Sequence, residues 1–497
     1  MIPVVDIFAG PGGLGEGFSS FLGQDGENVF RIAVSIEKDA HAHKTLRLRA
    51  FWRQFQHEEL PDVYWRYVRG AADWGDVKQA CPAAAASAEK DALQLTLSPD
   101  VETVAKVRRL IDERVPTDEP WILVGGPPCQ AYSIIGRARN SGNVDYNADT
   151  DHRQTLYIEY LQILADHAPT IFVMENVKGL LTAEHRNRRV FDRIRGDLAH
   201  PAVAIAREGR KARIRGARYS LHSLVVPSQT GELSPTDFVV RAENYGVPQK
   251  RHRVIIVGVR EGMGIEVGRL RPSSIRTVKQ HIGHFPHLRS GLSSAGDSLE
   301  TWRSTLAGFL GRRWLLHQPN ELRNSIRAAI ATAQNTELHR GAEYLSRRGG
   351  RPILNHDSRG HMPKDLARYL FASAYGQQYG TSPRLWDFPP DLLPDHANVE
   401  RAIDERLFSD RFRVQLAGDA STTITSHISK DGHYFIHFDP VQCRSLTVRE
   451  AATLQTFPSD YFFCGPRTSQ YVQVGNAVPP ELARKIAAIV AKALGRG

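Results

Sequence analysis

The sequence predicts an α/β protein with a parallel sheet and a second, smaller domain. The chain has 497 residues, and single hydrophobic cores stop growing at roughly 250–300 residues, so we expect two domains. Short apolar, β-branched runs alternate with helical stretches over residues 1–260, which is typical of a parallel sheet. From residue 261 to about 438 this alternation is lost, as expected where a different domain begins.

The first expected elements are a strand, a glycine-rich loop and a helix. The run "PVVDIF" at 3–8 predicts a buried strand, and "AGPGGLGEGF" after it predicts a loop that leads into a helix. A second strand, "RIAVSIE", is expected at 31–37, followed by a helix with Asp39 as its cap. An insertion at about 77–120 contains "SPDVETVAKVRRLIDERVP", which suggests a further helix.

Three more strands complete the expected sheet. The runs "WILVGG" at 121–126 and "TIFVMEN" at 170–176 predict buried strands, and "DHRQTLYIEYLQILADH" predicts the helix between them. "RHRVIIVGVR" at 251–260 predicts another strand. At the other end of the chain, "ELARKIAAIVAKAL" at 481–494 predicts an amphipathic helix that starts after two prolines.

Charge and cysteine content narrow the class of protein. Lys and Arg number 64 against 54 Asp and Glu, giving a net charge of +10, which favours a polyanionic partner such as nucleic acid. The four cysteines are far apart in sequence and suggest neither a zinc site nor a disulfide framework. The N-terminus does not resemble a secretion signal, and no apolar run approaches the length of a membrane span. We therefore expect a reduced, cytoplasmic protein without a bound metal.

The glycine-rich loop predicts a cofactor site. Gly10, Gly12 and Gly15 match G-x-G-x-x-G directly after a predicted strand, and Glu37 ends the next strand. Such a loop lets the backbone approach a ligand closely, while the acidic residue can accept hydrogen bonds from ribose hydroxyls. NAD, FAD and S-adenosylmethionine all fit this pattern, and a glycine-rich turn without a ligand is the simpler alternative.

A cysteine and a glutamate follow two neighbouring strands. Cys129 stands behind Pro127 and Pro128, which restrict the backbone and would hold the thiol at a defined point. Glu175 ends the next predicted strand, and ligands of open parallel sheets bind at this edge. The competing interpretations are a buried, inert thiol for Cys129 and a helix cap for Glu175.

Six stretches, in order, resemble the motifs of bacterial cytosine-5 DNA methyltransferases: "DIFAGPGGLGEGF", "GGPPCQAYSIIGR", "MENVKGLL", "NYGVPQKRHRVIIVG", "SLTVREAATLQTFP" and "QVGNAVPP". The resemblance implies a Rossmann-like, S-adenosylmethionine-dependent methyltransferase sheet with a target-recognition domain. It assigns 1–260 to the catalytic domain, 261–438 to the target-recognition domain, and 439–497 to a segment that returns to the catalytic domain.

The resemblance also implies a mechanism and a set of substrate contacts. Carbon 5 of cytosine is a poor nucleophile, so Cys129 would first add to carbon 6 of a flipped-out base while Glu175 donates to ring nitrogen 3. Arg253 would contact the base and Arg251 would support it. The base that removes the carbon 5 proton is not identified. The further residues expected to bind substrate are Gln130, Ser133 and Gln249.

The implied cofactor is S-adenosylmethionine, with S-adenosylhomocysteine as the product. Phe8 is expected under the adenine, Glu37 on the ribose, and Asp76 at the adenine amino group. Ala477 stands where many members have Ser, a small departure that should not abolish activity. The full set of expected cofactor contacts is Phe8, Gly10, Gly12, Glu37, Asp76, Pro127, Asn476 and Val478.

Three other functions are alternatives to this one. A flavin or nicotinamide oxidoreductase would leave Cys129, Glu175 and the arginine strand unexplained. An RNA cytosine-5 methyltransferase would use the same chemistry, but the large basic region at 261–438 favours DNA. A catalytically inactive DNA-binding regulator should have lost Cys129 or Glu175. We therefore expect a monomer that acts on double-stranded DNA, with a nuclease or phage-defence proteins as companions in a restriction–modification system.

Overall fold

The computed structural model describes most of the chain and divides it into two compact units. Unit 1 comprises residues 1–246, 251–274 and 477–497, and unit 2 comprises 247–250 and 275–476. The described residues are 1–55, 60–116, 119–128, 152–182, 184–185, 188–227, 233–293, 296–335, 353–394, 411–430 and 432–496.

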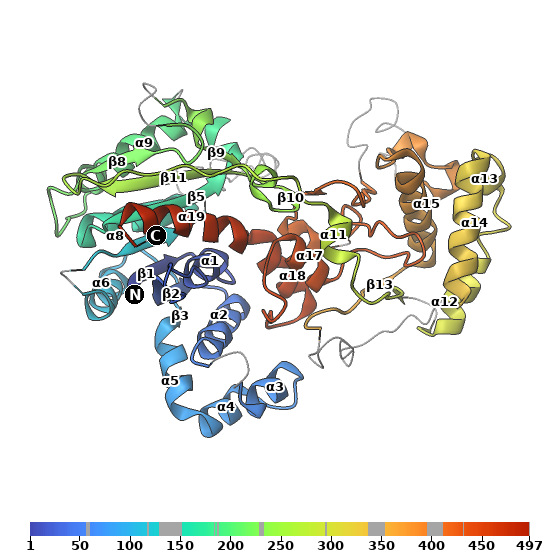
Figure 1. The fold of residues 1–497 in the computed structure, drawn as a ribbon, viewed down its shortest axis with the longest axis horizontal. Helices are drawn as coiled ribbons and strands as arrows, with labels where there is room; N and C mark the ends of the chain where they lie inside the picture. The colour runs from blue at the N-terminus through green and yellow to red at the C-terminus, as the bar shows by residue number, and fades with distance from the viewer. Residues whose placement is uncertain are drawn as a thin grey trace. The chain divides into compact units, whose positions relative to one another are not determined.

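Unit 1 is built on an eight-stranded sheet with the order β3-β2-β1-β4-β5-β11-β8, and β9 pairs with β11 (Figure 1). Strands β1 to β5 are parallel, whereas β11 is antiparallel to β5, β8 and β9. The chain reverses its direction between β9 and β11, over residues 242–251. The strands are β1 (Ile2–Ile7), β2 (Phe30–Glu37), β3 (Ala92–Gln94), β4 (Ile122–Gly125), β5 (Ile171–Val177), β8 (Tyr219–His222), β9 (Val239–Arg241) and β11 (His252–Arg260), with a separate hairpin of β6 (Glu184–His185) and β7 (Arg188–Arg189).

Helices cover both faces of this sheet. On one face, apolar side chains of the strands pack against α6, α8, α9 and α10 in a single hydrophobic core. On the other face, α1 packs closely against α19. The helices are α1 (Gly13–Ser19), α2 (Ala40–Trp52), α3 (Asp62–Val68), α4 (Trp74–Ala80), α5 (Pro82–Asp91), α6 (Val101–Arg114), α8 (His152–His167), α9 (Val190–Ala199), α10 (Pro201–Arg207) and α19 (Pro480–Ala493), with short 3₁₀ helices η2 (Lys178–Thr182), η3 (Pro235–Phe238) and η4 (Ala242–Tyr245).

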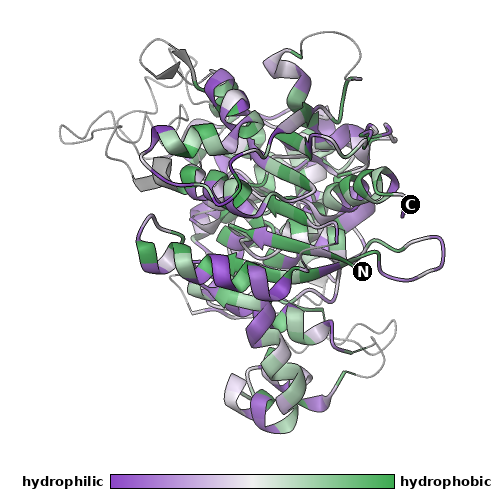
Figure 2. Ribbon diagram, turned by 90° about the vertical axis from the view of Figure 1, so that its left-hand side faces the viewer, coloured by the Kyte–Doolittle hydropathy of each residue, from purple (hydrophilic) through white to green (hydrophobic). Residues whose placement is uncertain are grey.

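The expected elements of this unit are confirmed within one or two residues. The central strands are buried and apolar, as Figure 2 shows for the hydrophobic residues along the sheet. Asp39 caps α2 by accepting hydrogen bonds from the amides of His41 and Ala42, at 3.0 and 2.8 Å. The insertion at 77–120 contributes more than the expected helix, because it also contains β3, which extends the sheet beside β2.

Unit 2 has its own hydrophobic core, formed largely by α12, α14 and α15. Its helices are α11 (Val278–Ile282), α12 (Leu299–Ala307), α13 (Arg313–Leu316), α14 (Asn320–Asn335), α15 (Pro363–Tyr379), α17 (Val448–Leu454) and α18 (Arg467–Asn476), with 3₁₀ helices η5 (Leu385–Asp387), η6 (Pro390–Leu392) and η7 (Ser426–Ser429). Its short strands pair as β10 (Gln249–Lys250) with β14 (Ser421–Thr422), and β12 (Gly291–Leu292) with β13 (Gly360–His361).

The boundaries of unit 2 differ from the expected 261 and 438. Residues 439–476 belong to unit 2 because their buried arginines bind its backbone. Arg444 Nε donates to the carbonyl of Leu288 at 3.1 Å, and Arg449 Nε donates to that of Leu354 at 2.7 Å. Among the described residues of both units, no helix combines the length and apolar character needed to cross a membrane.

Candidate active site

The glycine-rich loop begins where β1 ends. Phe8, Gly10 and Gly12 all have positive φ angles, of 55°, 58° and 93°, so the chain turns sharply there. Glu37 at the end of β2 holds this turn, since its Oε2 accepts a hydrogen bond from the Gly10 amide at 2.8 Å. Its Oε1 accepts from the amide of Asp39 at 2.8 Å. The structure thus brings the expected ribose-binding carboxylate directly to the expected cofactor loop.

The other glycines of the loop permit close packing. A Cβ atom on Gly13 would lie 2.1 Å from the carbonyl oxygen of Val478, and one on Gly15 would lie 2.8 Å from Oδ2 of Asp6. Val478 therefore lies against the loop, as expected, although the sequence indicated Gly10 and Gly12 and not Gly13. Asn476 is the last residue of α18 and belongs to unit 2.

Asp6 is a buried carboxyl group inside the otherwise apolar strand β1. Its Oδ2 accepts a hydrogen bond from the Gly15 amide at 3.2 Å, while its Oδ1 is buried without a hydrogen-bond partner among the described atoms. Burial raises the pKa of Asp6 to about 7, which the Gly15 amide only partly offsets. The single acidic residue in the apolar run "PVVDIF" is the sequence signal for this buried group.

A buried ion-pair cluster joins α1 to α2. Arg49 donates to both carboxylate oxygens of Glu16, at 3.0 and 2.5 Å, and Arg53 donates to Oε2 at 3.0 Å. Burial alone would raise the pKa of Glu16, but the two guanidinium groups outweigh it and lower the pKa to about 2. This cluster fixes the helix that follows the glycine loop, and nothing in the local sequence pattern indicated it.

Glu175 and Arg253 meet at the carboxyl end of β5. Arg253 Nε lies 2.8 Å from Glu175 Oε1, and both side chains are largely buried. The other carboxylate oxygen lies beside Gly126, where a Cβ atom would approach it to 2.9 Å. The neighbouring Asn176 donates from its side chain to the carbonyl of Pro127 at 3.0 Å. The loop that leads to Cys129 is therefore tied to the strand that carries Glu175.

Three expected site residues, Cys129, Gln130 and Ser133, lie outside the described residues. Arg251 is almost fully buried, with an exposed fraction of 1%. Burial lowers the pKa of Arg251 and Arg253, and the Glu175 carboxylate opposes this effect. Arginine nevertheless stays charged in proteins, so the site carries two cationic groups beside the Glu175 carboxyl group.

Gln249, which was expected to bind substrate, lies in unit 2 and not in the strand that carries Arg253. It does not continue the strand of Arg253, because it belongs to β10 in unit 2. Its amide is fully buried: Nε2 donates to Gln455 Oε1 at 2.5 Å, and Oε1 accepts from the Ile424 amide at 2.9 Å. These contacts occupy the amide within unit 2, so Gln249 organises the chain around it instead of presenting a free side chain to a substrate.

Asp76 is not at the edge of the sheet. It lies in the first turn of α4, where Asp73 and Asp76 cap the helix through hydrogen bonds of 2.8 and 3.0 Å. The strand beside β2 is β3, and the residue after it, Leu95, donates its amide to the carbonyl of Glu37 at 3.0 Å. The expected contact of Asp76 with adenine therefore has no support in the fold, because the helices α4 and α5 precede β3.

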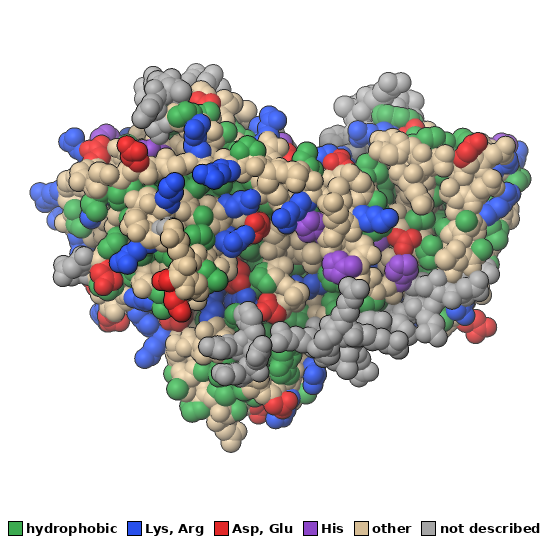
Figure 3. All heavy atoms as spheres, in the orientation of Figure 1, with side chains coloured by type: hydrophobic (Ala, Val, Ile, Leu, Met, Phe, Trp, Pro, Cys, Tyr) green, Lys and Arg blue, Asp and Glu red, His purple; other side chains and the backbone are tan. Residues whose placement is uncertain are grey.

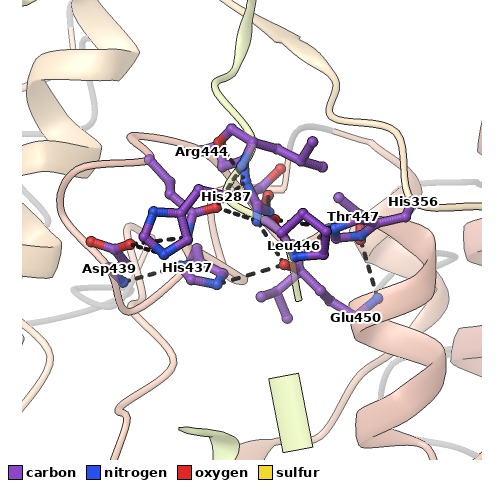
Figure 4. A network of polar contacts seen from close by, with 12 residues as sticks. His287, His356, His437, Asp439, Arg444, Leu446, Thr447 and Glu450 are labelled. Carbon is purple, nitrogen blue, oxygen red and sulfur yellow. Dashed lines mark hydrogen bonds and ion pairs between the residues drawn. The ribbon is translucent and has the colours of Figure 1, made fainter. Parts of the chain in front are cut away.

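The motif "SLTVREAATLQTFP" forms a buried polar network in unit 2 (Figure 4). Arg444 donates to both oxygens of Glu450 at 2.6 Å, and Glu450 also accepts from the Thr447 amide at 2.8 Å. His356 Nδ1 lies 2.9 Å from the Thr447 hydroxyl. Burial lowers the pKa values of His356 and His437 to about 4, so both rings are neutral near pH 7.

Comparison with known proteins decides the family. The model of the C-5 cytosine-specific DNA methylase family matches residues 95–200 and 236–492. The chain belongs to this family. It is accordingly an enzyme of the DNA (cytosine-5-)-methyltransferase class, with the mixed α/β fold of that class.

Individual relatives agree with this assignment. The methyltransferase is 30% identical to the type II methyltransferase M.Bpa9945I of Bacillus paralicheniformis, over 98% of each chain. It is 24% identical to the DNA (cytosine-5-)-methyltransferase M.ApeKI of Aeropyrum pernix, over 75% of this chain and 81% of the relative. The structure of a putative DNA modification methyltransferase encoded within an Escherichia coli prophage matches all of both chains, with a TM-score of 0.52 and 17% identity. That last likeness concerns the fold alone.

Proposed function

We propose that this methyltransferase transfers a methyl group from S-adenosylmethionine to carbon 5 of a flipped-out cytosine in double-stranded DNA, through a covalent adduct with Cys129. The observation that supports it most directly is the meeting of Glu175, Arg253 and the Pro127 loop at one edge of the sheet. Ligands of open α/β sheets bind at this edge.

The cofactor loop suits the proposed methyl donor. Gly10 faces open space, since a Cβ atom there would meet nothing within 4 Å, and Glu37 lies beside it with oxygen lone pairs to spare for hydroxyl donors. Gly12 and Val478 would complete the binding site, with Phe8 at its adenine end. When bound, S-adenosylmethionine supplies the electrophilic methyl group.

The remaining chemistry belongs to side chains of the protein. The Cys129 thiolate adds to carbon 6, and the displaced electron pair moves onto nitrogen 3, to which Glu175 in its protonated form gives a hydrogen bond or its proton. Arg253 orients the Glu175 carboxyl group through their 2.8 Å contact. After carbon 5 is methylated, loss of its proton and expulsion of the thiolate restore the aromatic ring. Taking the base out of the duplex costs roughly a few kcal/mol.

Of the three cysteines that the structure describes, the two in unit 2 are poor candidates for this role. Cys443 and Cys464 are buried in unit 2, and burial raises the pKa of Cys443 well above its usual range. Cys81 immediately precedes α5 in the insertion. A buried thiol with a raised pKa supplies little thiolate, so the environment of Cys443 disfavours it as the nucleophile.

The decisive test uses a DNA duplex with 5-fluorocytosine at the target position. Fluorine cannot leave as a proton does, so the enzyme should remain attached to the DNA when S-adenosylmethionine is present. Mass spectrometry should place the adduct on the peptide around Cys129. Cys129→Ser should abolish adduct formation and methyl transfer, whereas the control Cys81→Ser should retain both. An adduct on another cysteine, or methyl transfer by Cys129→Ser at the normal rate, would overturn the proposed mechanism.

The type II relatives support a role in a bacterial restriction–modification system. We further propose that the protein acts as a cytoplasmic monomer beside a companion nuclease. Bisulfite sequencing of host DNA with and without the gene should reveal methylated cytosines in one sequence context. An RNA oligonucleotide of the same sequence should accept no methyl groups, and efficient RNA methylation would instead favour the RNA enzyme.

A further inference from the structure

A cation-lined cavity of about 310 Å³ lies in unit 1 at the edge of the sheet that carries Glu175. Lys178 follows β5 directly, three residues after Glu175, and Arg241 ends β9. In the sheet, β11 lies between these two strands, with Arg253 opposite both Val177 of β5 and Val240 of β9. Lys178 and Arg241 each follow a residue that pairs with Arg253, so the cavity that they line lies one residue further along the strands than Arg253.

The cavity presents donors and no carboxylate. Besides Lys178 and Arg241, its polar lining consists of Asn244, Tyr245 and Thr236. Within the described residues, neither cation forms an ion pair or a side-chain hydrogen bond, and both side chains are exposed. The nearest acid in sequence, Glu243, is already bonded to His252 at 2.7 Å. Tyr245 is largely buried, which raises its pKa and keeps its hydroxyl protonated as a donor.

The other open cavities have carboxylates in their lining, Asp192 and Asp197 in one and Asp419 in the other. In a hollow beside α9 and α10, Arg193 and Arg207 are already paired with Asp197. In a cavity of unit 2, Lys250 is paired with Asp419 at 2.5 Å. Figure 3 shows Lys and Arg side chains spread over the surface with Asp and Glu side chains between them, so positive charge alone does not distinguish a site. The cavity of Lys178 and Arg241 is distinguished by a lining that contains cations and no carboxylate.

We propose that the cavity lined by Lys178 and Arg241 binds a backbone phosphate of the DNA substrate close to the target cytosine. A phosphodiester has only acceptor oxygens, and the cavity offers an ammonium, a guanidinium, an amide and hydroxyl groups to them. Phosphate contacts fix the register of a protein on DNA without reading its sequence. The inference rests on the proposed function, since it assigns Lys178 and Arg241 to holding the backbone beside the base that Glu175 contacts.

The first test measures how duplex affinity depends on salt. The slope of log K against log salt falls by about 0.9 for each phosphate neutralised, so Lys178→Gln with Arg241→Gln should make it shallower by about one. Affinity should fall roughly tenfold to a hundredfold on both target and non-target duplexes, because charge-assisted bonds are lost. The matched control is Arg193→Gln, which also removes an exposed cation from unit 1 and should leave the slope unchanged.

The second test locates the phosphate. Single phosphates around the target are replaced by neutral methylphosphonates, and binding is compared between wild type and the double variant. At one position the replacement should weaken the wild type and leave the variant unaffected. Equal losses in both proteins at every position, or an unchanged salt slope, would overturn the inference.

The two proposals fail separately. If the wild type forms the Cys129 adduct but the double variant keeps the wild-type salt slope, only the phosphate site is wrong. If the wild type transfers no methyl group to DNA, the proposed function itself is wrong. Unchanged affinity of the variants for S-adenosylhomocysteine, measured by calorimetry, shows that they are folded. Lys178→Gln alone changes one exposed side chain and provides the test if the double variant is unstable.

Discussion

Asp6 should make the stability of the methyltransferase fall as the pH rises from about 4 to about 7. Its pKa is about 7 in the folded protein, against a usual value of 3.8, because the carboxyl group is buried in β1. The folded state therefore holds the Asp6 proton more tightly than the unfolded chain does. Stability falls through the window in which the unfolded chain has lost this proton and the folded protein still keeps it.

The size of the effect follows from the shift. Three pKa units correspond to about 4 kcal/mol, at roughly 1.4 kcal/mol per unit. Asp6→Asn carries no titrating proton, yet its carbonyl oxygen can still accept the hydrogen bond from the Gly15 amide. The variant should be within about 1 kcal/mol of the wild type near pH 4.5 and become more stable by up to about 4 kcal/mol near pH 8, a gain of several degrees in melting temperature.

Thermal unfolding followed by tryptophan fluorescence between about pH 4.5 and pH 8 measures this difference. Asp192→Asn, which changes an exposed carboxyl group on α9, is the matched control and should follow the wild type throughout. A difference between Asp6→Asn and the wild type that stays constant over the whole range would refute the assignment of a buried, protonated Asp6.

Two substitutions test the packing around the site and in unit 2. Gly13→Ala places a Cβ atom 2.1 Å from the Val478 carbonyl oxygen, so calorimetry should show weaker binding of S-adenosylhomocysteine. The control Gly196→Ala adds a Cβ atom in open space on α9 and should stabilise the protein by up to about 1 kcal/mol. Unchanged binding by Gly13→Ala would contradict the close approach. Glu450→Gln leaves the buried Arg444 without its charge partner and should cost about 3–5 kcal/mol in denaturant unfolding. A loss of less than about 1 kcal/mol in the free energy of unfolding, as expected of a surface pair, would mean that the Arg444–Glu450 network does not stabilise the fold.

Five of the eight strands in the unit 1 sheet, and the edge where ligands bind, could be predicted from the sequence, whereas the short strands β3, β8 and β9 were not. Runs of apolar, β-branched residues identify buried strands locally, and glycine-rich turns mark where such strands end. Since the carboxyl ends of parallel strands share one edge, Glu37 was expected near Gly10, and the structure shows their 2.8 Å hydrogen bond. The position of Glu175 at the end of β5 follows from the same rule.

The tertiary structure alone decided which distant residues meet. Gly13 has no room for a side chain, because Val478 packs against it although the two residues are more than four hundred positions apart in the sequence. Gln249 looked like a substrate contact beside Arg253, but Gln455 and Ile424 bury its amide in unit 2. Periodicity records only whether a side chain faces water or the interior. The identity of its partner depends on how separate elements pack, and this is why the structure revealed the contacts of Gly13 and Gln249 and the pattern did not.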